Sequence, residues 1–132
     1  MSKDIRTLLP RNKSDGENAR AIIAEGYPAV EPVLAKLVEW LQDPNWPISK
    51  LLAPFLATIG APMIPYVQHV LETNDAGWKY QVLQHIVAAS PEIALAVKDE
   101  LERMATTPNH DEKVEEVDVM AQSILNKLRT EN

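Results

Sequence analysis

Apolar residues recur along this chain at intervals of three and four, the period of an α-helix. They are Val30, Val33, Leu34, Leu37 and Leu41; Ile48, Leu51, Leu52, Phe55, Leu56 and Ile59; Ile64, Val67, Val70 and Leu71; Trp78, Val82, Leu83, Ile86 and Val87; and Val114, Val117, Ala121, Ile124 and Leu128. No segment alternates apolar and polar residues with a period of two, which half-buried strands require. The pattern therefore predicts an all-α protein.

Glycines and prolines stand where these helices should end and begin. Gly26 and Gly60 suit helix C-termini, and Pro28 and Pro62 suit the first turns of the helices that follow. Pro32 and Pro54 fall inside expected helices, where each either kinks the helix or marks an end that lies a few residues away.

Cap residues mark three more helix starts. Ser14 and Glu17 have the spacing of a capping box, which predicts a helix over residues 15–25. Ser90 before a proline predicts a helix that reaches about residue 106. Asn109 with Glu112 predicts a last helix over residues 109–130.

Two segments of the chain repeat one another. "EGYPAVEPVLAKL", beginning at Glu25, aligns with "IGAPMIPYVQHVL", beginning at Ile59, at an offset of 34 residues. Helix pairs that recur at such intervals are typical of an α-solenoid. We expect one domain of three antiparallel helix pairs at residues 14–42, 45–73 and 75–106, preceded by an extension over residues 1–13 and closed by a capping helix at 109–130.

Composition narrows the class of protein. The 132 residues, 45% of them hydrophobic, suffice for one domain with a core. The net charge of −6 disfavours a general nucleic-acid binder, because binding to phosphates needs a basic face. There is no cysteine, no apolar N-terminal signal and no run long enough to span a membrane. We expect a soluble, cytoplasmic protein that is a monomer.

Three stretches resemble a known family. "LLPRNKSDGENA", "GYPAVEPVLAKLVEWLQDPNWPIS" and "WKYQVLQHIV" are similar to small bacterial HEAT-like domains of unknown function, over residues 8–125. This resemblance implies a right-handed stack of antiparallel helix pairs and no particular activity. Related HEAT-like folds mostly bind proteins, while a few are DNA glycosylases or bilin lyases and some look like immunity proteins against toxins.

Residues with catalytic or metal-binding chemistry are scattered. His69, His85 and His110 lack the spacing of a helical metal motif, and the serines lack a GxSxG elbow. No glycine-rich phosphate loop is present. The sequence thus predicts neither a catalytic residue nor a metal or cofactor.

The candidate binding surface surrounds "WLQDPNWPIS" and the start of the helix at Trp78. Its residues are Asp43, Asn45, Trp46, Trp78, Lys79, Tyr80, Asn12 and Lys13. Because turns of successive repeats line up, Trp46 and Trp78 are expected to be neighbours, with Trp40 packed beneath. The tryptophans are either buried staples between repeats or the exposed anchors of a binding ridge.

These patterns favour a non-catalytic module that binds another protein through this ridge or a concave face. Residues 99–132 hold nine acids against four Lys and Arg residues. This excess is more typical of a solvated helix face, and the alternative is an acidic patch that binds a basic partner. One version of this hypothesis is a module that inhibits a basic toxin. The alternative is a HEAT-like enzyme acting on nucleic acid or a small cofactor, which would use a basic patch at Lys3, Arg6, Arg11, Lys13 and Arg20.

Overall fold

The computed structural model describes residues 4–131, and every regular element in that range is helical. The α-helices are α1 (Gly16–Glu25), α2 (Leu34–Glu39), α3 (Pro47–Ala57), α4 (Ile64–Leu71), α5 (Ala76–Val82), α6 (Pro91–Ala96), α7 (Lys98–Thr106), α8 (His110–Val114) and α9 (Val117–Glu131). Short 3-10 turns occupy Ile5–Leu8, Glu31–Val33, Trp40–Gln42 and Ala61–Met63, and a π-helical segment, Leu83–Val87, extends α5. The all-α prediction is confirmed.

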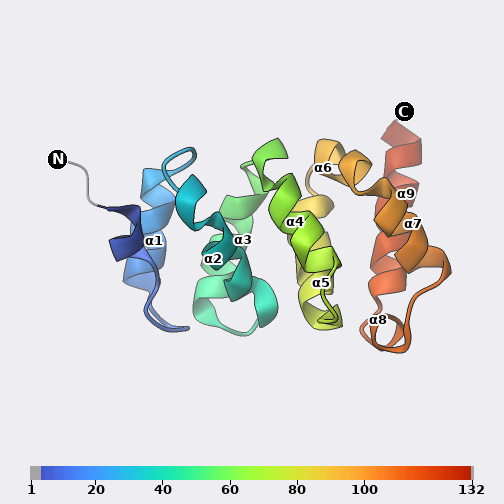
Figure 1. The fold of residues 1–132 in the computed structure, drawn as a ribbon, viewed down its shortest axis with the longest axis horizontal. Coiled ribbons are helices and arrows are strands. Elements are labelled where there is room, and N and C mark those ends of the chain that lie inside the picture. The colour runs from blue at the N-terminus through green and yellow to red at the C-terminus, as the bar shows by residue number, and fades with distance from the viewer. Residues whose placement is uncertain (1–3, 132) are drawn as a thin grey trace.

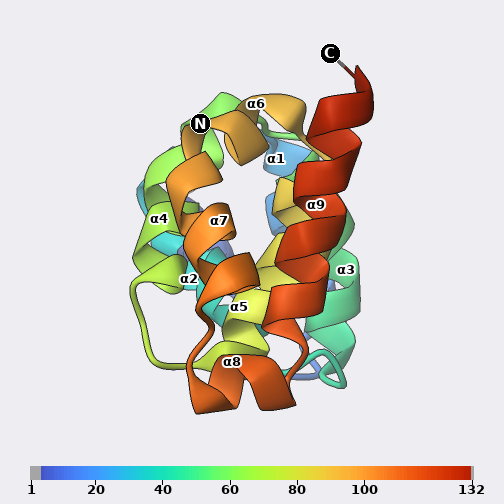
Figure 2. The same cartoon turned by 90° about the vertical axis from the view of Figure 1, so that its right-hand side faces the viewer.

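The helices follow one another along the long axis of the molecule, from α1 near the N-terminus to α9 at the opposite end (Figure 1). Seen from that end, α3, α5 and α9 lie in one row and α2, α4 and α7 in another (Figure 2). In the first row α1 packs on α3, α3 on the π-helical segment, and that segment on α9. In the second row α2 packs against α4, which places these two helices side by side.

The predicted apolar stripes form the core between the rows. Val30, Val33, Leu34, Leu37 and Leu41 are all buried, as are the stripes of α4 and α5 apart from Ile64. The last stripe contains one error, because Val114 is 62% exposed. Its short helix α8 instead buries Glu112, a residue that the apolar pattern does not include.

Several expected helix starts are displaced by a few residues. The N-cap of α1 is Asp15, whose carboxylate accepts a hydrogen bond from the Asn18 N–H, and not Ser14. Pro28 precedes the second helix, which begins with the 3-10 turn at Glu31 and includes Pro32 in its first turn. Pro54 does lie inside α3. Local sequence favours several neighbouring start sites, and tertiary packing selects among them.

The two C-terminal helices that the sequence predicts as continuous are each broken. Residues 91–106 divide at Val97, where φ is −111°, into α6 and α7. The expected capping helix divides at Glu116, whose φ is 61°, into α8 and α9. Its Asn109–Glu112 capping box is confirmed. None of the helices in the described range combines the length and apolarity needed to cross a membrane.

Gly60 allows the turn between α3 and α4, and its replacement should destabilise the protein. Its φ of 81° is rarely adopted by residues with a Cβ, although no atom would clash with one. We expect Gly60→Ala to lower the free energy of unfolding by roughly 1–3 kcal/mol, measured by urea denaturation. Gly77→Ala, inside α5 with ordinary contacts only, is the control and should stabilise by up to about 1 kcal/mol. Equal effects of the two substitutions on the free energy of unfolding would contradict this role of Gly60.

Candidate functional site

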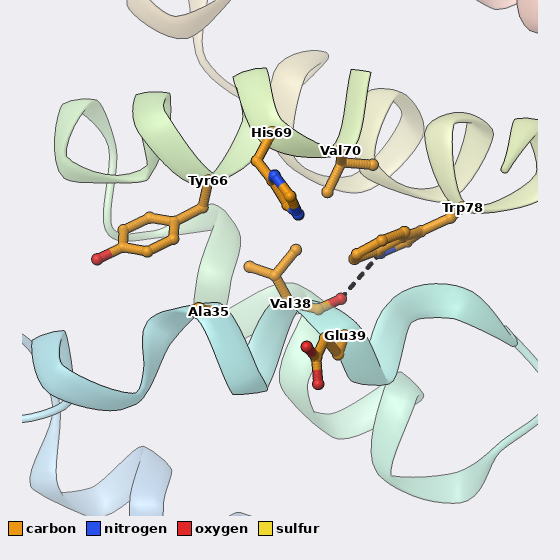
Figure 3. Close-up of a pocket in the computed structure, with 7 residues that line it drawn as sticks. All are labelled: Ala35, Val38, Glu39, Tyr66, His69, Val70 and Trp78. Atoms are coloured by element: carbon orange, nitrogen blue, oxygen red, sulfur yellow. Dashed lines mark hydrogen bonds between the residues drawn. The ribbon is translucent and has the colours of Figure 1, made fainter. Parts of the chain in front are cut away.

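A groove runs between α2 and α4 and ends at the first turn of α5 (Figure 3). We call it the α2–α4 groove. It is lined by Ala35, Val38 and Glu39 from α2, by Tyr66, His69 and Val70 from α4, and by Trp78 from α5. Most of its surface is apolar or aromatic, and Glu39 is its only carboxylate.

Helical spacing brings these side chains to facing positions. Ala35, Val38 and Glu39 are related by three and four residues, as are Tyr66, His69 and Val70, so each set shares one face of its helix. Ala35 has the smallest side chain in the lining, which leaves space opposite His69 and Tyr66 (Figure 3). The groove therefore results from the packing of α2 on α4 and from one small residue.

The indole of Trp78 is fixed at the end of the groove. Its Nε1–H donates a 3.0 Å hydrogen bond to the carbonyl of Val38, and the residue is 7% exposed. The His69 ring meets it edge to face, with 6.5 Å between ring centroids. Because the indole donor already has a partner, a ligand in the groove would meet the ring itself.

Tyr66 forms the opposite part of the wall. In Figure 3 its phenol points away from Trp78, and the hydroxyl donates a 3.2 Å hydrogen bond to Glu31 Oε1. Burial and this carboxylate partner raise the pKa of Tyr66, so the phenol stays protonated near neutral pH. The side-chain polar groups left to a ligand are those of Glu39 and His69, and no hydrogen bond joins these two.

The size of the groove restricts what could occupy it. Its volume is about 230 Å³. Pockets for drug-sized ligands and cofactors usually enclose roughly 300–1,000 Å³. The groove thus suits one or two side chains of a partner better than a whole cofactor.

Part of the predicted ridge is assembled in the structure. The half-buried Trp46 contacts Trp40, with ring centroids 5.6 Å apart and planes at 72°. Asp43 Oδ1 accepts a 2.8 Å hydrogen bond from the Asn45 N–H and so fixes the turn before α3. The carbonyl of Lys13 accepts a 3.2 Å bond from the N–H of Ile48, which holds the loop containing Asn12 against the start of α3.

The predicted site residues at the start of α5 are buried or half-buried and so do not extend an exposed ridge. Trp78 belongs to an aromatic pair with His69, so the two tryptophans expected to be neighbours have different ring partners. Lys79 is 3% exposed, and Tyr80 is half-buried. For Trp78, the structure selects the staple over the exposed anchor, because its indole links α5 to α2.

Lys79 belongs to a buried ion cluster that the sequence did not predict. Its Nζ lies 3.0 Å from Oε2 of Glu112, which is fully buried. Arg103 donates to both oxygens of the same carboxylate, at 2.6 and 3.1 Å, and the Asn109 N–H donates at 2.9 Å. The cluster joins α5, α7 and α8. The sequence identified Glu112 only as the partner of a helix cap.

These contacts decide the ionisation of Glu112. Burial alone would favour the neutral acid, but the hydrogen bonds from Arg103, the Asn109 backbone and Lys79 outweigh it and lower the pKa of Glu112 to about 2. The carboxylate is therefore charged across the physiological pH range. Lys79 and Arg103 therefore both pair with a charged carboxylate inside the protein.

The N-terminal basic patch of the enzyme alternative is partly neutralised. Arg6 lies 3.7 Å from Asp4, and Arg11 lies 3.0 Å from Asp15. The Arg11 backbone and side chain both donate to that carboxylate and lower the pKa of Asp15. Lys3 falls outside the described residues. Within residues 4–131, no three histidine or acidic side chains gather as a metal-binding group.

The chain matches a known protein family. The family model described as a domain of unknown function, DUF5071, matches residues 8–125. A comparison with curated proteins finds no match. The part of the chain that matches includes the whole α2–α4 groove and the ion cluster.

Proposed function

This chain belongs to the DUF5071 family of domains of unknown function, and we propose that it is a non-catalytic module that binds another protein through the α2–α4 groove. The observation that carries the proposal is an accessible groove with apolar and aromatic walls. Concave sites with mostly apolar and aromatic walls and a few polar groups are typical binding sites.

The proposed architecture is a HEAT-like, right-handed α-solenoid of three helix pairs with a C-terminal cap. Two observations support it: the repeat at an offset of 34 residues, and the packing of helices in two rows in chain order. In such a stack, the second helices of successive pairs form a continuous face. Here α2 and α4 are those helices, so the groove would lie where solenoids commonly receive their partners.

The polar groups of the groove support contact more than catalysis. The Trp78 N–H and the Tyr66 hydroxyl are both occupied by partners within the protein. Glu39 and His69 face the groove without a hydrogen bond between them, and no lysine or arginine lines it to stabilise developing negative charge. A partner whose exposed side chain is apolar in part and basic at its end would match this surface; a basic toxin is one such partner.

Filling the groove provides the test. Ala35 is an exposed residue of α2, and Ala35→Leu would occupy the space without removing a buried contact. We expect proteins captured from native lysate by the wild type to be lost with this variant, and affinity for the purified captured protein to fall at least tenfold.

The matched control is Ala24→Leu, the same change at an exposed position of α1. It should retain the partner, while circular dichroism shows that both variants fold. If Ala35→Leu binds the purified partner as tightly as Ala24→Leu does, the groove is not the binding site. The ridge at Trp46 would then be the next surface to test.

A further inference from the structure

The α2–α4 groove has acidic side chains in or beside it but no lysine or arginine in its lining. Its lining contains Glu39 and neither lysine nor arginine, and Glu31 stands beside it as the hydrogen-bond partner of Tyr66. Both carboxylates are on exposed residues and are not needed for a salt bridge within residues 4–131. The groove therefore offers negative charge to a ligand and lies on a chain whose net charge is −6.

The remaining walls suit a flat cation with an apolar stem. Ala35, with the 2% of Val38 that is exposed, supplies aliphatic contact over the buried Val70. Tyr66, His69 and the exposed edge of Trp78 supply rings. Cations are attracted to the faces of aromatic rings, and arginine most often makes such contacts. A guanidinium is planar, is weakly hydrated and can donate two parallel hydrogen bonds to a carboxylate. A lysine ammonium is compact and strongly hydrated, so it fits these walls less well.

We propose that the α2–α4 groove takes an arginine side chain from a basic segment of a partner protein, with its stem against the aliphatic wall, its guanidinium on the aromatic rings and its charge paired with Glu39. This assignment rests on the proposed protein-binding function and names the chemistry of the anchor. The groove's volume of about 230 Å³ accommodates one such side chain.

A titration with short peptides tests this assignment directly. The probes are three acetylated and amidated peptides, Gly-Ser-X-Ser-Gly, in which X is arginine, its uncharged analogue citrulline, or leucine. Binding is followed by two-dimensional NMR of the ¹⁵N-labelled protein. The indole N–H of Trp78 reports on the groove, and the indoles of Trp40 and Trp46, which lie outside its lining, serve as internal references.

We expect the arginine peptide to shift the Trp78 indole and the backbone amides of α2 and α4 saturably. The citrulline peptide should bind roughly three- to tenfold more weakly, since it lacks the charge that pairs with Glu39. Glu39→Gln should weaken binding of the arginine peptide by the same factor and leave the citrulline peptide unaffected. Glu25→Gln, an equal change of net charge on an exposed residue of α1, should have no effect.

Other outcomes separate this inference from the proposed function. If leucine or citrulline binds in the groove as tightly as arginine, the groove is a docking site but the arginine assignment is wrong. If the arginine peptide shifts only amides of α8 and α9, attraction to the acidic C-terminal segment explains binding and the inference is also wrong. If no peptide shifts the Trp78 indole at tens of millimolar, both the inference and the groove as a binding site are overturned.

Discussion

Glu112→Gln should lower the free energy of unfolding by roughly 3–5 kcal/mol, the usual cost of removing one partner from a buried ion pair. The amide keeps the shape of the side chain but leaves the Lys79 ammonium buried without a counter-ion. It also presents an N–H₂ group to a site in which Lys79, Arg103 and the Asn109 backbone all donate hydrogen bonds. Urea denaturation followed by circular dichroism measures the change.

The pH dependence of stability should identify the same carboxylate. The pKa of Glu112 falls from 4.5 to about 2 on folding, so its contribution is complete above pH 4.5 and disappears as the pH falls toward 2. That contribution is about 3 kcal/mol, and Glu112→Gln should lack this part of the acid-induced loss.

Two variants serve as controls for this expectation. Glu115→Gln changes the same type of residue at an exposed position nearby and should have little effect. Lys79→Met combined with Glu112→Gln removes the isolated buried charge and should recover much of the lost stability. A double variant as unstable as the sum of its single variants would show that charge pairing is not the cause.

Trp78→Ala should be about as destabilising, at roughly 3–5 kcal/mol. The indole is 7% exposed and its loss would open a cavity where α5 meets α2 and α4. The substitution also removes the hydrogen-bond donor to the Val38 carbonyl, 40 residues away in the chain. The same urea denaturation experiment measures the loss.

Trp46→Ala is the matched control because it removes the same side chain from a half-buried position. It would lose the contact with Trp40 and a smaller buried area than Trp78→Ala, so we expect a smaller loss of stability. A larger effect of Trp46→Ala would mean that the turn at residues 43–46, and not Trp78, is the main staple between the helix pairs.

The sequence was sufficient to predict the helices and most of the core, because both depend on local periodicity. Leu34, Leu37 and Leu41 are three and four residues apart, so they share one face of a helix, and that face is buried. The Asn109–Glu112 capping box and the glycine before α4 were also predictable, since backbone geometry near a helix end is decided within a few residues. The breaks at Val97 and Glu116 were not, because neither position carries a glycine or a proline.

The candidate site depended on contacts between segments far apart in the chain. The sequence singled out Trp78 and Lys79 as aromatic and charged residues. It did not predict that Trp78 is buried against Val38 or that Lys79 is buried against Glu112, both distant in the chain. Tyr66 and Glu39 lie in no recognisable motif, and His69 lacks the spacing of a helical metal motif. These residues form one groove only because α2 and α4 pack side by side.

The sequence by itself determined that the chain is helical, where most helices lie and which faces they bury, since apolar spacing and end signals act over a few residues. Only the tertiary structure decided which polar residues are accessible. A lysine on a helix surface has the same local signature whether it faces water or a carboxylate 33 residues away. That difference depends on how whole helices pack, which also places the residues of the α2–α4 groove on facing helices.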